Sequence, residues 1–191
     1  MHYCIGVITE QFPTDDVLME KLAPYNEEKF YEGTDEDEEI TKEYPQFMWD
    51  FWTVGGRYGG KIKLKIDPEN EEYRWRFYDK EPRSGRLFRH KMLEDMNANP
   101  PKMFFSEEDY YKYLGEGYEH LRVDGCKIKD AIGFDELVVN CWGFIGRNGE
   151  AYSRDHWNGK DFVSDDQYED KVKAATKGCD DCYITFVDIH D

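Results

Sequence analysis

Two nearly continuous apolar segments, one near each end of the chain, restrict most strongly what this sequence can fold into. They run from His2 to Thr9 and from Cys182 to Ile189. Both are rich in β-branched and aromatic residues, a composition typical of strands that are buried on both faces. Because a sheet edge would expose such strands to solvent and to other chains, we expect both to be central strands of one sheet.

The sequence between these strands contains signals for a few further elements. Thr14 predicts the N-cap of a helix that Pro24 ends. The stretch from Leu137 to Ile145 predicts a strand, and Asn148-Gly149 predicts a type I′ turn into a return strand. Ser164 then predicts the N-cap of a second helix, which precedes the last strand.

In chain order these elements give β-α and then β-β-α-β, which is the split βαβ pattern of ferredoxin-like folds. We therefore predict an α+β fold in which the helices cover one face of an antiparallel-rich sheet. The core comprises residues 1–26 and 136–191, and residues 27–135 form a large insertion that carries a basic β-hairpin. The whole chain, residues 1–191, is expected to be a single domain.

The composition excludes several classes of protein. The chain has 42 acidic and 25 basic residues and a formal net charge of −17, which would repel nucleic acid from the surface as a whole. An aromatic content of 16% is too high for a disordered acidic tail. No apolar run approaches the ~20 residues that span a bilayer, no basic leader opens the chain, and the five cysteines are an odd number. We therefore expect a cytoplasmic protein that does not bind membranes.

The charge is unevenly distributed along the chain. Residues 27–43 contain nine acidic and two basic side chains, including the run Asp35, Glu36, Asp37, Glu38 and Glu39. Residues 57–91 contain eleven basic and six acidic side chains, and within them 61–66 and 73–78 alternate polar and apolar residues. Alternation at this period is typical of strands, so we predict a hairpin with one cationic face and, before it, a solvated acidic loop.

The segment from Trp49 to Tyr58 has the most unusual local composition, because two tryptophans precede paired glycines and an arginine. Paired glycines let a ligand approach backbone N–H groups, arginine binds anions through two parallel hydrogen bonds, and aromatic rings stack on bases. On this interpretation a nucleotide-like anion is bound by Trp49, Trp52, Gly55, Gly56, Arg57, Tyr58, Arg74 and Arg76. The alternative is structural: the glycines form a tight turn, the tryptophans fill the core, and the arginine pairs with a nearby carboxylate.

No pattern in the sequence specifies a metal, a cofactor or a reaction. Cys179 and Cys182 have the spacing of a zinc knuckle, but a zinc site requires two further ligands and no second pair with this spacing exists. We therefore predict no metal site, no cofactor and no catalytic residue.

Three segments resemble a family of small proteins from bacteriophages and actinobacteria. They are the opening strand and helix as far as Asn26, the stretch from 49 to 59, and the C-terminal part with 146–150 and 185–190. The middle segment is similar to the family's W-x-x-G-G-R-[WY]-x-G signature, with Tyr58 at a position that usually holds tryptophan. The resemblance implies a phage or mobile-element context and no particular activity.

Together these observations predict a non-enzymatic, phage-type binding protein that antagonises a host defence in the host cytoplasm. It would do so by sequestering a nucleotide-like anion at the Gly-Gly-Arg segment. In a first alternative, the acidic run from Asp35 to Glu39 mimics nucleic acid and blocks a basic host protein, such as a CRISPR effector or a nuclease. In a second alternative, the chain is a small hydrolase. The step from the resemblance to antagonism is an analogy.

Overall fold

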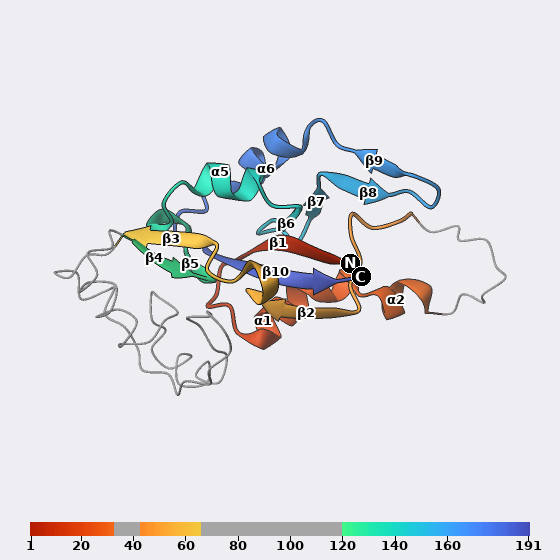
Figure 1. Ribbon diagram of the computed structural model, residues 1–191, viewed down its shortest axis with the longest axis horizontal. Coiled ribbons are helices and arrows are strands. Elements are labelled where there is room, and N and C mark those ends of the chain that lie inside the picture. The colour runs from red at the N-terminus through yellow and green to blue at the C-terminus, as the bar shows by residue number, and fades with distance from the viewer. Residues whose placement is uncertain (33–42, 66–119) are drawn as a thin grey trace.

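The computed structural model describes residues 1–32, 43–65 and 120–191, and within them the chain is a mixed α/β protein dominated by strands (Figure 1). The strands are β1 (His2–Thr9), β2 (Phe51–Val54), β3 (Ile62–Lys65), β4 (His120–Val123), β5 (Gly125–Lys127), β6 (Gly143–Ile145), β7 (Ala151–Ser153), β8 (Asp155–Trp157), β9 (Phe162–Ser164) and β10 (Tyr183–His190). The α-helices are α1 (Asp15–Leu22), α2 (Glu27–Tyr31), α5 (Phe134–Val139) and α6 (Tyr168–Thr176). Short 3-10 helices are η1 (Ala23–Tyr25), η2 (Gly56–Tyr58) and η5 (Ile128–Asp130).

The two apolar end segments form the centre of the main sheet, which confirms the prediction made for them. The strand order is β2-β10-β1-β6-β7, and β5 also pairs with β10. β1 and β10 are antiparallel along their whole length, from His2↔His190 to Thr9↔Tyr183. On its other side β1 pairs in parallel with β6. A split βαβ unit has one strand between its two parallel strands, whereas β1 and β6 are direct neighbours.

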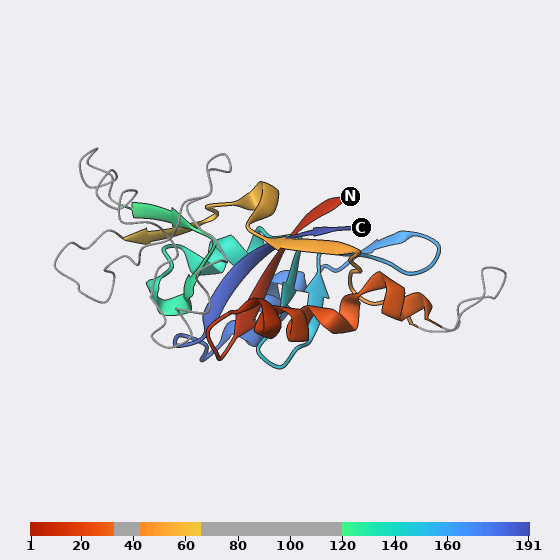
Figure 2. The same cartoon turned by 90° about the horizontal axis from the view of Figure 1, so that it is seen from below.

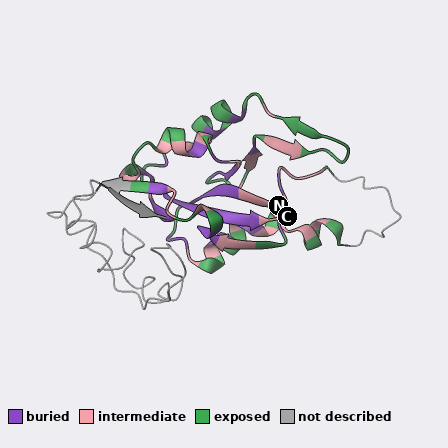
Figure 3. Ribbon diagram, in the orientation of Figure 1, coloured by how far each residue is buried: buried purple, intermediate pink, exposed green. Residues whose placement is uncertain are grey.

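Alternate residues of the central strands face two separate hydrophobic cores. Ile8 of β1 belongs to the cluster that contains Val138 of α5 and Val172 of α6. Its neighbour Val7 belongs to the cluster that contains Leu18 of α1. Helices therefore cover both faces of the sheet (Figure 1, Figure 2), and the expectation that they cover one face is wrong. The reason is that the central strands are buried at nearly every position, as the purple of Figure 3 shows, so each face requires a cover.

Residues 137–139 lie in helix α5 instead of the predicted strand. Gly133 precedes this helix with a left-handed φ of +67°. Asp135 and Glu136 then place negative charge in the first turn, where the helix dipole favours it. The predicted strand therefore begins only at Gly143, as β6.

The predicted hairpin and the predicted second helix are both present, but the turn type and the start of the helix differ from the predictions. In the turn between β6 and β7, Gly149 N–H donates to the Gly146 carbonyl at 2.9 Å. Gly149 has a φ of +84° but Asn148 does not have a positive φ, so the turn is not the predicted type I′. Ser164 lies in β9, and the N-cap of α6 is Gln167, which makes no side-chain cap hydrogen bond. In the turn before the helix, Asp165 Oδ1 accepts a hydrogen bond from Gln167 N–H at 2.9 Å.

The segment that the sequence assigns to an insertion contributes to the main sheet. β2 and β5 both pair with β10, while β3 pairs with β4 in a separate two-stranded sheet. The predicted hairpin partner of β3, residues 73–78, and the acidic run 35–39 lie outside the described residues. Among the described helices, none is both long and apolar enough to cross a bilayer.

Candidate functional site

The glycine pair after β2 forms a tight turn against two buried carboxylates. Gly55 and Gly56 have left-handed φ values of +68° and +51°. A Cβ atom on Gly55 would lie 2.6 Å from the Asp124 carboxyl carbon, and one on Gly56 would lie 2.2 Å from Cβ of Asp188. Both positions therefore require glycine for two independent reasons, the backbone angle and the absence of space.

The backbone N–H groups of this turn bind the chain's own carboxylates. Arg57 N–H donates to Asp188 Oδ2 at 2.7 Å, and Gly60 N–H donates to Asp124 Oδ1 at 2.6 Å. Asp188 is 4% exposed and Asp124 2% exposed, so these hydrogen bonds help to offset the cost of burying two carboxylates. Of the residues predicted to bind an anion, Arg57 thus donates its amide to an internal carboxylate, while Gly55 N–H donates to the Phe186 carbonyl at 2.8 Å.

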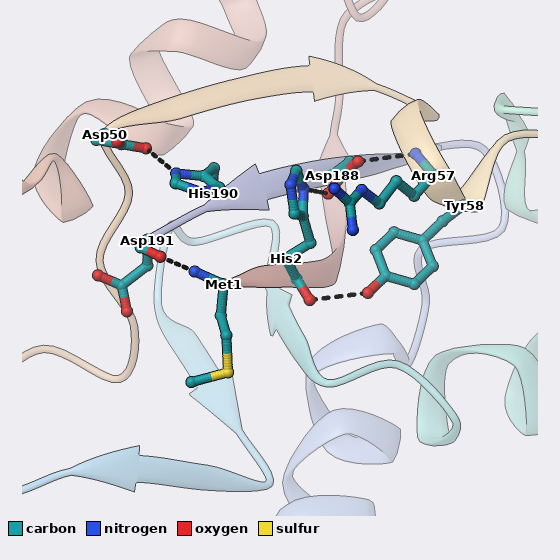
Figure 4. Close-up of polar contacts among 8 residues, drawn as sticks. All are labelled: Met1, His2, Asp50, Arg57, Tyr58, Asp188, His190 and Asp191. Atoms are coloured by element: carbon teal, nitrogen blue, oxygen red, sulfur yellow. Dashed lines mark hydrogen bonds and ion pairs between the residues drawn. The ribbon is translucent and has the colours of Figure 1, made fainter.

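Asp188 also orients a histidine at the end of the sheet (Figure 4). His2 Nδ1 lies 2.9 Å from Asp188 Oδ1, and the Tyr58 hydroxyl donates to the His2 carbonyl at 2.9 Å. The His2 and His190 rings meet edge to face with centroids 4.9 Å apart, and His190 Nδ1 lies 2.9 Å from Asp50 Oδ1. The hydrogen bond with His190 lowers the pKa of the Asp50 carboxyl.

Arg57 is the part of the predicted anion site that is open to solvent. It is exposed and forms no ion pair with any residue that the structure describes. The Arg57 backbone N–H and the His2 ring both contact the Asp188 carboxylate, so this one carboxylate holds both residues in place. Arg74 and Arg76, which were predicted to join it, lie outside the described residues.

The predicted stacking tryptophans do not lie beside Arg57. Trp49 is 6% exposed, and its indole N–H donates to the Leu22 carbonyl at 2.8 Å, so it is a core residue. Trp52 is half-buried and pairs with Ile189 in the β2–β10 ladder. Ile189 and Asp188 point to opposite faces of the sheet, which separates Trp52 from the carboxylate that holds the Arg57 amide. For the tryptophans, the structural alternative describes the geometry.

A second candidate site, absent from the sequence analysis, is an aromatic pocket of about 330 Å³ near the two chain ends. Its walls come from β1, α2, the segment before β2, the residue before β6, and the β8–β9 hairpin. The residues that line it are Tyr3, Glu27, Tyr31, Tyr44, Pro45, Gln46, Phe47, Met48, Trp142, Trp157, Phe162 and Asp191. We call it the aromatic pocket below.

The rings of the aromatic pocket are arranged as a fixed floor and an exposed rim. Tyr3 and Trp142 stack with centroids 4.1 Å apart and form the floor. Trp157 and Phe162 face each other across the β8–β9 hairpin at 5.4 Å, and Phe162 is 59% exposed. Contiguous exposed apolar surface beside a cavity is typical of ligand-binding grooves, so this pair is a candidate contact for a ligand.

The tip of the β8–β9 hairpin lies against the pocket wall. A Cβ atom on Gly159 would lie 2.8 Å from the Tyr44 ring, and the φ of Gly159 is +96°. The ring centroid of Tyr44 in turn lies 5.1 Å from that of Phe30 in α2. Tyr44 therefore contacts both the β8–β9 hairpin and α2. These contacts set the distance between the two walls of the pocket.

Burial and nearby carboxylates resist the ionisation of two tyrosines that line the aromatic pocket. Burial and the charge of Asp191 raise the pKa of Tyr3. Burial, the neighbouring Tyr44 and the charges of Glu27 and Asp191 raise the pKa of Tyr31. Phenols whose ionisation is resisted by nearby carboxylates mark a place where a cation is favoured over an anion.

The sequence contained only a weak signal for this pocket. Its lining residues come from segments that are as far apart in the chain as Tyr3 and Asp191, and no single local pattern contains them all. The one available indication is the β8–β9 stretch itself, where Trp157 and Phe162 sit in an otherwise polar hairpin. Comparison of the chain with protein-family models, with curated proteins and with solved structures finds no significant match.

Proposed function

We propose that this chain is a binding protein that holds a small organic cation, such as a methylated ammonium group, in the aromatic pocket. The observation that carries the proposal is the combination of aromatic faces and carboxylates around one cavity of about 330 Å³. A cavity of this size accommodates a small ligand. The binding class is the one that the sequence predicts; the proposed site and the sign of the ligand charge are different.

The chemistry of the lining supports a cation over a neutral ring. Ring faces attract cations through their quadrupole, and each such contact contributes about 0.5–2 kcal/mol. Tyr3, Trp142 and Trp157 supply faces, while Glu27 and Asp191 supply full negative charge. An organic cation loses little hydration on entering such a pocket, whereas a phosphate would meet two carboxylates and a net protein charge of −17.

Calorimetric titration with choline and with its neutral isostere 3,3-dimethylbutan-1-ol tests the proposal. The two probes have nearly the same shape, so the difference in affinity reports the charge. We expect choline to bind and the neutral alcohol to bind at least about tenfold more weakly, because tenfold corresponds to about 1.4 kcal/mol, within the range of one cation–π contact. Equal affinities would show that the pocket prefers a neutral apolar ligand to a cation. If neither probe binds, the proposal is contradicted.

Two variants with a matched control locate the site. Glu27→Gln removes a pocket carboxylate without changing its shape and should weaken choline binding, whereas Glu28→Gln removes the exposed charge next to it and should not. Trp157→Ala, on the exposed rim, should weaken binding by roughly 3- to 30-fold, as expected for the loss of one cation–π contact. Equal effects of the two glutamate variants would show that only the overall charge of the protein matters.

A second candidate is capture of a nucleotide-like anion at Arg57, as predicted from the sequence. The observation in its favour is that Arg57 is exposed, forms no ion pair with a described residue, and is anchored with His2 on one carboxylate. The same titration with inorganic pyrophosphate separates the two candidates, because Arg57→Ala abolishes binding only if the guanidinium holds the anion. A hydrolase would in addition use the free ring nitrogen of His2 as a base.

The acidic-mimic alternative remains a proposal for residues outside the described part of the chain. It rests on the run Asp35, Glu36, Asp37, Glu38 and Glu39 and on the net charge of −17. If a basic host protein is captured in this way, its association should slow steeply as salt is added, because exposed charges are screened beyond ~8–10 Å. A complex insensitive to salt would contradict it.

We also propose that the core of the chain is ferredoxin-like. The order of β1, α1, β6, β7, α6 and β10 along the chain supports a ferredoxin-like core. The direct pairing of β1 with β6 is the feature that an experimental structure should examine first.

A further inference from the structure

Three side chains that play no part in the proposed binding sites form a cluster beneath the main sheet. Cys4 of β1 and Cys141, which lies just before β6, have their Sγ atoms 4.0 Å apart. Lys61 Nζ lies 3.4 Å from Cys4 Sγ. Both thiols are buried, with exposures of 3% and 0%.

Lys61 is a half-buried ammonium group whose hydrogen-bond partner among the described residues is a cysteine. None of the ion pairs among the described residues includes it. Its Nζ lies 5.8 Å from the centroid of the Tyr58 ring and 5.6 Å from that of Phe186, which offer weak cation–π contacts. A charge removed from water requires a counter-charge, and Cys4 is the group within hydrogen-bond distance.

We propose that Lys61 holds Cys4 as a reactive thiolate and that hydrogen peroxide converts Cys4 and Cys141 into a disulfide. The site is thus a specific oxidative modification site, in which Cys4 attacks and Cys141 resolves. Two neighbouring backbones make this possible, because Trp142 N–H donates to the Cys4 carbonyl at 3.1 Å and keeps the two cysteines on adjacent strands.

The balance of protons on the two thiols fits these roles. The hydrogen-bond contact with Cys141 and the charge and hydrogen bond of Lys61 lower the pKa of Cys4, against the opposing effect of burial. Burial raises the pKa of Cys141, which remains a thiol and donates to the Leu137 carbonyl at 3.3 Å. Burial opposes the charge of Lys61, but the two sulfur groups outweigh it and raise the pKa of this amine, so it stays protonated.

The reaction is balanced with peroxide as the only oxidant. The Cys4 thiolate attacks one peroxide oxygen, the O–O bond breaks, and Cys4 becomes a sulfenic acid while hydroxide leaves and is protonated to water. The Cys141 sulfur then attacks the Cys4 sulfur, the S–O bond breaks, and a second water leaves with the thiol proton. One peroxide is reduced to two waters, and two thiols are oxidised to one disulfide. The Sγ atoms must approach from 4.0 Å to about 2.05 Å, the length of the bond.

A cavity of about 380 Å³ provides the approach to this cluster. Lys61 and Leu137 belong to its wall, and these are the residues that contact Cys4 and Cys141. Neither cysteine lines this cavity, so peroxide must displace the Lys61 side chain to reach Cys4 from this side.

Treatment with peroxide followed by peptide mapping tests the proposal on the full chain. We expect loss of two hydrogen atoms and a cross-linked peptide pair that joins Cys4 to Cys141. Cys126 is an internal control, because it is fully buried and burial raises its pKa well above the ordinary value. Oxidation of Cys4 to the sulfinic acid without a disulfide, or faster modification of Cys126, would overturn the proposal.

The role of the lysine has its own variant and control. Lys61→Met should slow peroxide oxidation of Cys4 about tenfold or more, because loss of the cation raises the thiol pKa by about one unit or more. Lys63→Met, two residues along the same cavity wall, should leave the rate unchanged, and Lys61→Arg should retain it. An unchanged rate in Lys61→Met would overturn the assignment of Lys61, and the disulfide mapping in the unaltered chain decides the site even where a variant folds poorly.

The pH profile of the reaction provides a further check. Alkylation of Cys4 by iodoacetamide should remain fast below the ordinary thiol range in the unaltered chain and follow that range in Lys61→Met. The profile belongs to the cluster as a whole, since several titratable groups face Cys4: Lys61, Cys141, Asp188, Tyr58 and Tyr168. A profile identical in both proteins would contradict a thiolate held by the lysine.

Discussion

Gly56 and Asp188 show how single residues determine the geometry of the turn after β2. The buried carboxylate occupies the space that a side chain at residue 56 would need, and it accepts the hydrogen bond of the next backbone amide. The glycine pair thus leaves room for the buried Asp188 carboxylate, and this carboxylate also orients His2.

Gly56→Ala should therefore be far more destabilising than a glycine substitution with the same backbone angle in open space. Gly133 is the matched control, because its φ is +67° and no atom lies within 4 Å of an added Cβ. We expect Gly133→Ala to reduce the free energy of unfolding by about 1 kcal/mol, and Gly56→Ala to reduce it by several times as much through overpacking and loss of the Asp188 contacts. Denaturant unfolding measures both, and equal values would show that Asp188 moves aside without loss.

The sequence predicts part of this site at the residue scale and misses the rest for a definite reason. Paired glycines before an arginine indicate a turn with available amides, and that turn exists. The groups that occupy the amides are Asp124 and Asp188, which lie more than sixty residues further along the chain. Local composition contains no information on which distant carboxylate contacts which amide. A turn that binds a ligand anion and a turn that binds a carboxylate of the chain therefore have the same local sequence.

At the scale of elements, helix α6 is held at its start by Asp165. This carboxylate accepts from Gln167 N–H at 2.9 Å and pairs with Lys171 Nζ at 2.5 Å. The pairing with Lys171 is the main cause that lowers the pKa of Asp165. The sequence predicted the helix but placed its N-cap at Ser164, which lies in β9, whereas the N-cap is Gln167. Serine is a strong cap signal, and local sequence does not show that Ser164 pairs with Asp155 in a strand.

Asp165→Ala should reduce the free energy of unfolding by about 1 kcal/mol at neutral pH, because it removes the hydrogen bond from Gln167 N–H and the contact with Lys171. The next residue, exposed Asp166, is the control, and its alanine variant should change stability by less than about 0.5 kcal/mol. Because the folded-state pKa of Asp165 is lowered, its contribution is complete above the pKa of an unfolded aspartate and is lost as the pH falls through the folded value. The difference between Asp165→Ala and the unaltered chain should thus shrink in acid. Thermal unfolding at several pH values checks this, and a difference that grows in acid would contradict it.

At the scale of the whole molecule, the two predicted end strands bring the chain termini together and so create the aromatic pocket. His2 pairs with His190, and Tyr3 of the first strand and Asp191 beyond the last both line the pocket. The position of the end strands could be predicted, because an uninterrupted apolar strand must be central. The pocket could not, because it is assembled from segments whose meeting depends on the complete topology, including the parallel pairing of β1 with β6.

The indole N–H signals of the five tryptophans offer the most direct measurement of the central claim, which is that the aromatic pocket binds an organic cation. Two of these side chains, Trp142 and Trp157, line the pocket, while Trp49 and Trp52 line a different cavity. In a ¹H–¹⁵N titration with choline, the signals of Trp142 and Trp157 should shift together and saturate, and those of Trp49 and Trp52 should stay in place. Shifts confined to Trp49 and Trp52, or no saturable shift of Trp142 and Trp157, would contradict the account.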